Sequence, residues 1–103
     1  MTQPPAEDTL HTIRNEIGLI AWKELARFFA QGTAVAVNIE LDLADVALQF
    51  SRDNTAAVSA WMKEGKIARV SDELAGAWFD AGATVRAIVV NPWVLVQAAD
   101  ANN

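Results

Sequence analysis

The last apolar stretch of the chain constrains its fold most. Residues 84–97 read TVRAIVVNPWVLVQ, so β-branched and aromatic side chains occupy successive positions on both sides of Asn91 and Pro92. Such residues favour strands, and a strand that is apolar at successive positions needs cover on both faces. Pro92 has no amide hydrogen and marks a turn, a bulge or an edge. We predict a C-terminal β-hairpin or one long bent strand, covered on both sides.

Side chains alternate along a strand, so Val94 and Val96 are expected on one face and Trp93 and Leu95 on the other. The chain's own helices or a second copy of the chain could cover the Trp93 face. If a second copy does so, the possible interaction surface contains Trp93, Leu95 and Arg86.

Helical periodicity fills most of the remaining sequence. Apolar residues recur at i, i+3, i+4 and i+7 in several segments, and capping residues or glycines bound these segments. The predicted helices cover roughly residues 8–17, 21–31, 43–50, 54–64 and 72–79. Residues 33–40 and 66–70 are predicted strands, and the segment between them could form a right-handed crossover. The fold class is therefore α+β, with a three- or four-stranded mixed sheet packed with about five short helices.

The chain of 103 residues is long enough for one domain, which we place at residues 8–97 between loosely ordered tails at 1–7 and 98–103. It has no cysteine, which fits a reducing compartment. The start MTQPPAED has no basic residue before an apolar block, and every apolar run is far shorter than the roughly 18 residues of a membrane span. We expect a cytoplasmic protein.

The order of several aromatic, glycine and aspartate positions resembles a small bacterial family, domain of unknown function 2288. The resemblance runs from about Leu19 to Gln97, and LDLADVA and PWVLVQ are its most specific parts. The other matching positions are Trp22 with Leu25, Phe29 with Gly32, Asp53 with Val58 and Trp61, residues 65–72, and Trp78. It implies a bacterial intracellular protein with a single-domain fold, and it assigns no activity and no catalytic residue.

Asp42, Asp45 and Asp53 are the nearest approach to a carboxylate cluster. Together with Arg52 they could hold a divalent cation or a small ligand in a cleft at the strand ends, because hard cations prefer oxygen ligands. The favoured interpretation is structural. Asp42 and Asp53 are expected to cap helices, and Asp45 is expected to be a favourable first-turn charge.

Catalytic patterns are weak. His11 is the only histidine, and it lies on the polar side of the first predicted helix. The sequence has no GxSxG, GxGxxG or GxxxxGK[ST] motif, so it offers no support for a nucleophile elbow or a phosphate cradle. We predict no catalytic residue, metal or cofactor, and the chain is more typical of a non-enzyme.

A formal net charge of −5 disfavours binding to nucleic acid or to anionic membranes. Lys63, Lys66 and Arg69 could still contact phosphates, with Trp61 or Trp78 stacking on bases. Both tryptophans have the spacing of core residues, so this hypothesis is the weakest of three. The first is a protein-interaction or homodimerisation module, and the second is the ligand or metal site at the aspartates.

Overall fold

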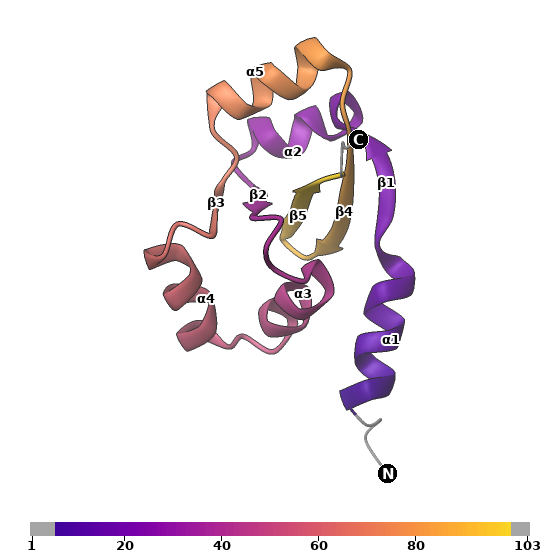
Figure 1. Ribbon diagram of the computed structural model, residues 1–103, viewed down its shortest axis with the longest axis vertical. Helices are drawn as coiled ribbons and strands as arrows, with labels where there is room; N and C mark the ends of the chain where they lie inside the picture. The colour runs from indigo at the N-terminus through magenta and orange to yellow at the C-terminus, as the bar shows by residue number, and fades with distance from the viewer. Residues whose placement is uncertain (1–5, 100–103) are drawn as a thin grey trace.

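The computed structural model describes residues 6–99 and contains one five-stranded mixed sheet in the order β1-β4-β5-β2-β3 (Figure 1). The helices are α1 Ala6–Glu16, the 3-10 helix η1 Trp22–Leu25, α2 Ala26–Ala30, α3 Leu43–Ser51, α4 Thr55–Lys63 and α5 Asp72–Ala81. The strands are β1 Gly18–Ala21, β2 Ala34–Val37, β3 Ile67–Arg69, β4 Thr84–Val90 and β5 Trp93–Ala98. The predicted α+β class is confirmed. The predicted number of strands is wrong, because the sheet has five rather than three or four.

The C-terminal strands form a hairpin. β4 and β5 pair antiparallel up to Val90 and Trp93, so Asn91 and Pro92 are the two residues of the turn, and the peptide bond between them is cis. β5 then pairs parallel with β2 on its other side, with Leu95 opposite Val35. This double pairing places the apolar C-terminal strand in the middle of the sheet.

The sequence pattern missed β1. Gly18 was expected to end a helix and Ala21 to begin the next, but residues 18–21 pair antiparallel with β4. Four residues are too few to show an alternating pattern, so only the pairing with β4 defines this strand. The predicted helix at 21–31 is divided into η1 and α2.

The predicted crossover between residues 33 and 70 is also wrong, because β2 and β3 pair antiparallel. A crossover joins two parallel strands. A single helix between them brings the chain back to the end of the sheet at which the first strand began. Here two helices, α3 and α4, lie between the strands, so the chain enters β3 in the opposite direction.

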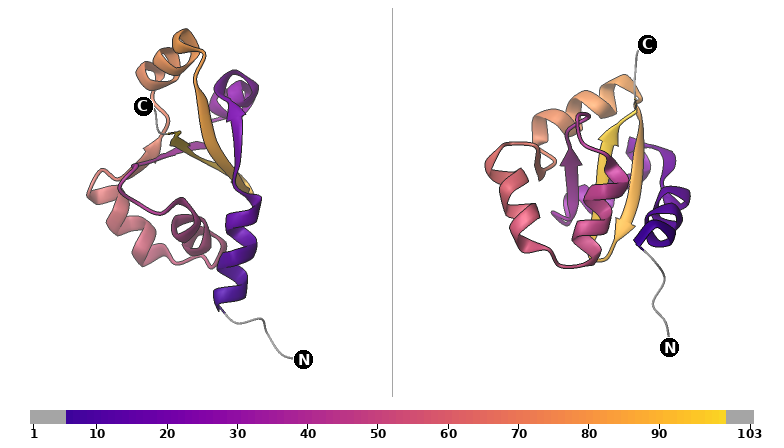
Figure 2. Two further views of the ribbon diagram at one scale, coloured as in Figure 1. Left: turned by 45° about the vertical axis from the view of Figure 1, so that its right-hand side comes forward. Right: turned by 60° about the horizontal axis from the view of Figure 1, so that its bottom comes forward.

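Helices lie on both faces of the sheet (Figure 2), and their apolar side chains form two cores that β5 separates. Leu95 belongs to the core under α1, α3 and α4, and Val94 and Val96 belong to the core under η1, α2 and α5. This confirms both the predicted alternation and the predicted cover on two faces. The chain's own helices therefore supply that cover.

The helices and strands extend slightly beyond the predicted domain limits of 8–97, since α1 begins at Ala6 and β5 ends at Ala98. Of the predicted tails at 1–7 and 98–103, residues 1–5 and 100–103 lie outside the described residues. Within residues 6–99, no helix combines the length and apolarity that crossing a bilayer requires.

Candidate functional site

Helix α3 keeps the predicted carboxylates apart. Asp42 caps its first turn, with Oδ1 accepting a hydrogen bond from the Ala44 amide at 3.0 Å. Arg52 and Asp53 follow its last residue, about 13 Å away along a helix of nine residues. Asp45 lies exposed in the first turn. The four residues therefore do not form one site, and the part of the chain that the structure describes contains no acidic or histidine cluster able to hold a metal.

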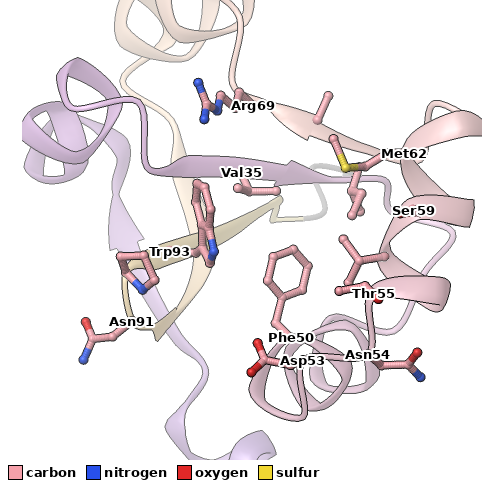
Figure 3. A pocket seen from close by; sticks show the side chains of 14 residues that line it. Val35, Phe50, Asp53, Asn54, Thr55, Ser59, Met62, Arg69, Asn91 and Trp93 are labelled. Carbon is pink, nitrogen blue, oxygen red and sulfur yellow. The ribbon is translucent and has the colours of Figure 1, made fainter.

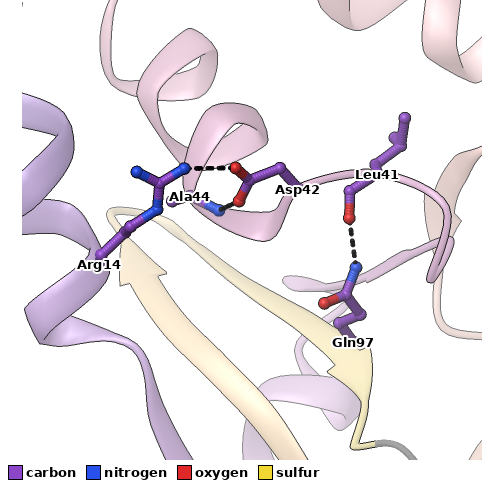
Figure 4. A network of polar contacts seen from close by, with 5 residues as sticks. All are labelled: Arg14, Leu41, Asp42, Ala44 and Gln97. Atoms are coloured by element: carbon purple, nitrogen blue, oxygen red, sulfur yellow. Dashed lines mark hydrogen bonds and ion pairs between the residues drawn. The ribbon is translucent and has the colours of Figure 1, made fainter. Parts of the chain in front are cut away.

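Asp42 instead connects α3 to α1. Arg14 Nη2 donates to Asp42 Oδ2 at 2.6 Å, and both side chains are about half exposed (Figure 4). Partial burial by itself raises the pKa of Asp42. The hydrogen bond and charge of Arg14, together with the amides of Ala44 and Asp45, outweigh that effect and lower the pKa below its ordinary value of 3.8. The predicted cap is confirmed, and it also carries an ion pair.

The predicted interaction surface is not continuous. Leu95 is fully buried, so it is inaccessible to a partner. Arg86 pairs with Gln97 at one end of the hairpin, whereas Trp93 pairs with Val90 at the other. Helix α3 and its neighbours cover the middle of this face. Trp93 and Arg86 border two different hollows in the surface.

The hollow beside Trp93 is a pocket of about 340 Å³ that three separate parts of the chain enclose (Figure 3). Phe50, Val58 and Met62 come from α3 and α4, and Val35 and Ile67 come from β2 and β3. The hairpin turn supplies the remaining wall through Asn91, Pro92 and Trp93. Trp93 reaches the pocket because it is the first residue of β5, where the covering helices bury it only in part.

Polar groups surround this apolar interior. The Arg69 guanidinium carbon lies 5.9 Å from the centroid of the Trp93 ring. Figure 3 shows Arg69 and Asp53 at opposite sides of the opening, with Trp93 between them. The Asn54 side chain already forms two hydrogen bonds within the protein. Its oxygen accepts from the Ala57 amide and caps α4, and its nitrogen donates to the Gln49 side chain.

Asp53 does not cap α4 as predicted. Asn54 takes that position, and Asp53 has a left-handed backbone with φ 54° at the turn from α3 to α4. Aspartate is one of the few residues that adopt this conformation readily. The turn presents the Asp53 carboxylate to the pocket, which the local pattern did not reveal.

The three basic candidates for nucleic-acid binding have different environments. Lys66 pairs with Glu64 at 3.7 Å, Lys63 ends α4, and Arg69 belongs to the Trp93 pocket. The two tryptophans suggested for base stacking pack against the cores instead. Trp61 packs against the core under α1, α3 and α4. Trp78 packs against the core under η1, α2 and α5, where its ring centroid lies 5.0 Å from that of Trp22. Of these three basic residues, Arg69 lies beside a tryptophan that borders a pocket, the partly buried Trp93.

A second hollow lies between α1, β1 and the segment before α3. Leu19 and Ile39 are 69% and 72% exposed beside it, and Arg14, Asp42 and Arg86 also border it. At its floor, the buried Gln97 amide nitrogen donates to the Asn38 and Leu41 carbonyls at 3.0 and 2.8 Å (Figure 4 shows the Leu41 bond). Gln97 thus holds the loop after β2 to the end of β5.

Comparisons with known proteins give the chain a family and a related structure. The family described as Protein of unknown function (DUF2288) matches residues 8–98. The chain is also similar to PA1075 from Pseudomonas aeruginosa, whose solution structure was determined by NMR. The identity is 33%, the match covers 100% of this chain and 95% of that chain, and the TM-score is 0.80. No curated protein matches.

Proposed function

The chain belongs to the family of unknown function DUF2288, and we propose that it is a binding module that works without catalysis, with the Trp93 pocket as its binding site. The observation that carries this proposal is the position of Trp93. Trp93 is partly buried and forms part of the wall of a pocket of about 340 Å³, with Arg69 beside its ring. Pockets of roughly 300–1,000 Å³ with apolar walls and a few convergent polar groups are typical of binding sites.

The test is a screen of single-ring aromatic and aliphatic fragments against ¹⁵N-labelled protein. We expect some fragments to shift the amide resonances of the pocket lining, and we expect Trp93→Leu to abolish those shifts. The matched control is Phe79→Leu, because Phe79 is an exposed aromatic on α5 outside the pocket. If no fragment shifts the lining amides, or if Trp93→Leu responds as Phe79→Leu does, the pocket is not the binding site.

Homodimerisation is the second candidate, and the edge strand β1 supports it. Its four residues, Gly18–Ala21, carry no charge, and Leu19 is 69% exposed. Edge strands of monomers usually carry charges or bulges that prevent pairing, as the opposite edge strand β3 does with Arg69. Two copies of β1 could pair antiparallel about a two-fold axis, which is the commonest symmetry of soluble oligomers.

Sedimentation and light scattering test this candidate. At roughly 50 µM, a range in which weak interfaces assemble, we expect a dimer that Leu19→Lys converts to a monomer. Phe79→Lys adds the same charge at an exposed apolar position on α5 and should leave the dimer intact. A wild-type monomer at this concentration would exclude the β1 dimer.

A further inference from the structure

The interior of the Trp93 pocket has the shape and composition that suit a flat ring. The rings of Trp93 and Phe50 form two of its walls, and Val35, Val58 and Ile67 complete the apolar lining (Figure 3). Aromatic groups pair favourably in offset or edge arrangements, with centroids about 4.5–7 Å apart. A volume of about 340 Å³ is at the small end for ligand sites, so the occupant is one ring with short substituents.

The charged side chains at the opening of the pocket would orient a bound molecule. Arg69 lies on one side and Asp53 on the other (Figure 3). Among residues 6–99, neither side chain forms an ion pair, and Asp53 makes no side-chain hydrogen bond. The guanidinium group matches the geometry of a carboxylate, and the Asp53 carboxylate accepts hydrogen bonds from an ammonium group. The complementary molecule therefore carries opposite charges at its two ends.

We propose that the Trp93 pocket binds a small aromatic molecule with a carboxylate at one end, held by Arg69, and an amine at the other, held by Asp53. This inference rests on the proposed function of the pocket as a binding site. Arg69 is already placed over the edge of the pocket by its contact with the Trp93 ring, so a bound carboxylate meets a positioned cation.

Four probes of similar size separate the three features of this ligand. They are 4-(aminomethyl)benzoate, with the ring and both charges; 4-methylbenzoate, without the amine; benzylamine, without the acid; and 4-(aminomethyl)cyclohexanecarboxylate, without the flat ring. Titration of ¹⁵N-labelled protein gives a dissociation constant for each. We expect 4-(aminomethyl)benzoate to bind about tenfold more tightly than any probe that lacks one feature.

Two variants that each remove one charge test which residue holds the carboxylate and which holds the amine of the ligand. Arg69→Gln should weaken both benzoates about tenfold and leave benzylamine unchanged. Asp53→Asn should weaken 4-(aminomethyl)benzoate and benzylamine but not 4-methylbenzoate, and asparagine tolerates the left-handed backbone at this position. Lys63→Gln is the control, since Lys63 lies outside the pocket lining. The Arg69 and Asp53 side chains are exposed, so their variants are expected to fold. The amide spectra verify this directly.

The outcomes separate this inference from the function on which it rests. Equal binding of the cyclohexane compound, or benzoate affinities that Arg69→Gln leaves unchanged, would overturn the ligand class while leaving the pocket a binding site. If the lining amides respond neither to these probes nor to the wider fragment screen, the proposed function fails as well.

Discussion

At the scale of single residues, Val89 and Val94 are a matched pair. They lie opposite each other on β4 and β5 and point to the same face of the sheet. Val94 is 1% exposed and Val89 is 56% exposed, because the core under η1, α2 and α5 includes only Val94. Residue type therefore does not decide what either valine contributes, and the covering helices do.

We predict that Val94→Ala lowers the free energy of unfolding by about 2 kcal/mol more than Val89→Ala does. Both changes lose the same strand propensity, so the difference reports the buried methyl groups and the cavity that they leave. Urea denaturation followed by circular dichroism measures both values. Similar losses in the two variants would contradict the described burial.

Asp42 gives a pH-dependent prediction. Its pKa is lowered in the folded protein, so its ion pair with Arg14 contributes stability above the ordinary pKa of 3.8. That contribution is lost as the pH falls through the folded-state value. Asp42→Asn removes the charge but retains a good capping residue. We expect the variant to be less stable at pH 7 by less than about 1 kcal/mol, because both side chains are half exposed.

The difference between wild type and Asp42→Asn should shrink as the pH falls below 3.8 and be smallest once the carboxyl group is protonated in the folded protein as well. Thermal unfolding at several pH values gives the profile. A difference that stays constant across this range would show that the carboxylate charge is not responsible.

At the scale of elements, the helix ends follow local rules with one exception. Asp42 caps α3 as predicted, and Ser71 caps α5, where its hydroxyl accepts a hydrogen bond from the Leu74 amide at 3.0 Å. Asn54 rather than Asp53 caps α4. The turn from α3 needs one left-handed residue, and Asp53 takes that conformation, which moves the cap one position onward.

Helix α5 contains Gly76 and is followed by Gly82. Alanine should fit well at the first position and poorly at the second. Gly76 lies exposed in the helix interior, and a methyl group added there would meet no atom within 4 Å beyond its chain neighbours and the backbone of its own helix. Gly82 ends the helix with φ 61°. We predict that Gly76→Ala stabilises the protein by about 0.5–1 kcal/mol and that Gly82→Ala destabilises it by about 1 kcal/mol. Paired thermal denaturation curves measure both. Two shifts of the same sign would contradict this account of the helix end.

At the scale of the whole molecule, the sheet has a central and a peripheral part. β5 pairs with a neighbour on each side and carries apolar residues of both cores. The edge strands β1 and β3 are short, with four and three residues, and each pairs with one described neighbour. Opening an edge strand therefore exposes much less apolar surface than opening β5.

Amide hydrogen exchange should reveal this difference. We predict that β5 amides exchange only through global unfolding, and that amides of β1 and β3 exchange at least about tenfold faster. The comparison is made by NMR in mild denaturant at low protein concentration, where a β1 dimer dissociates. Equal protection of β1 and β5 would mean that the edge is covered.

The candidate site was only partly predictable. The sequence marked Trp93, Arg69 and Asp53 for three different reasons, as a surface aromatic, a phosphate contact and a helix cap. It did not place them together, because they lie on a hairpin, an edge strand and a helix turn that are distant in the chain. The predicted groups of Asp42 with Asp53, and of Trp93 with Arg86, are instead separated by an intervening helix or by the length of a strand.

The sequence alone determined the features that depend on neighbours within a few positions. These are the helix segments, most of their caps, and the apolar alternation that requires β5 to be covered on both faces. Only the tertiary structure decided the strand order, the existence of β1, the antiparallel entry into β3 and the Trp93 pocket. Each of these arises from pairing or packing between distant segments, and no local periodicity encodes which of those segments meet.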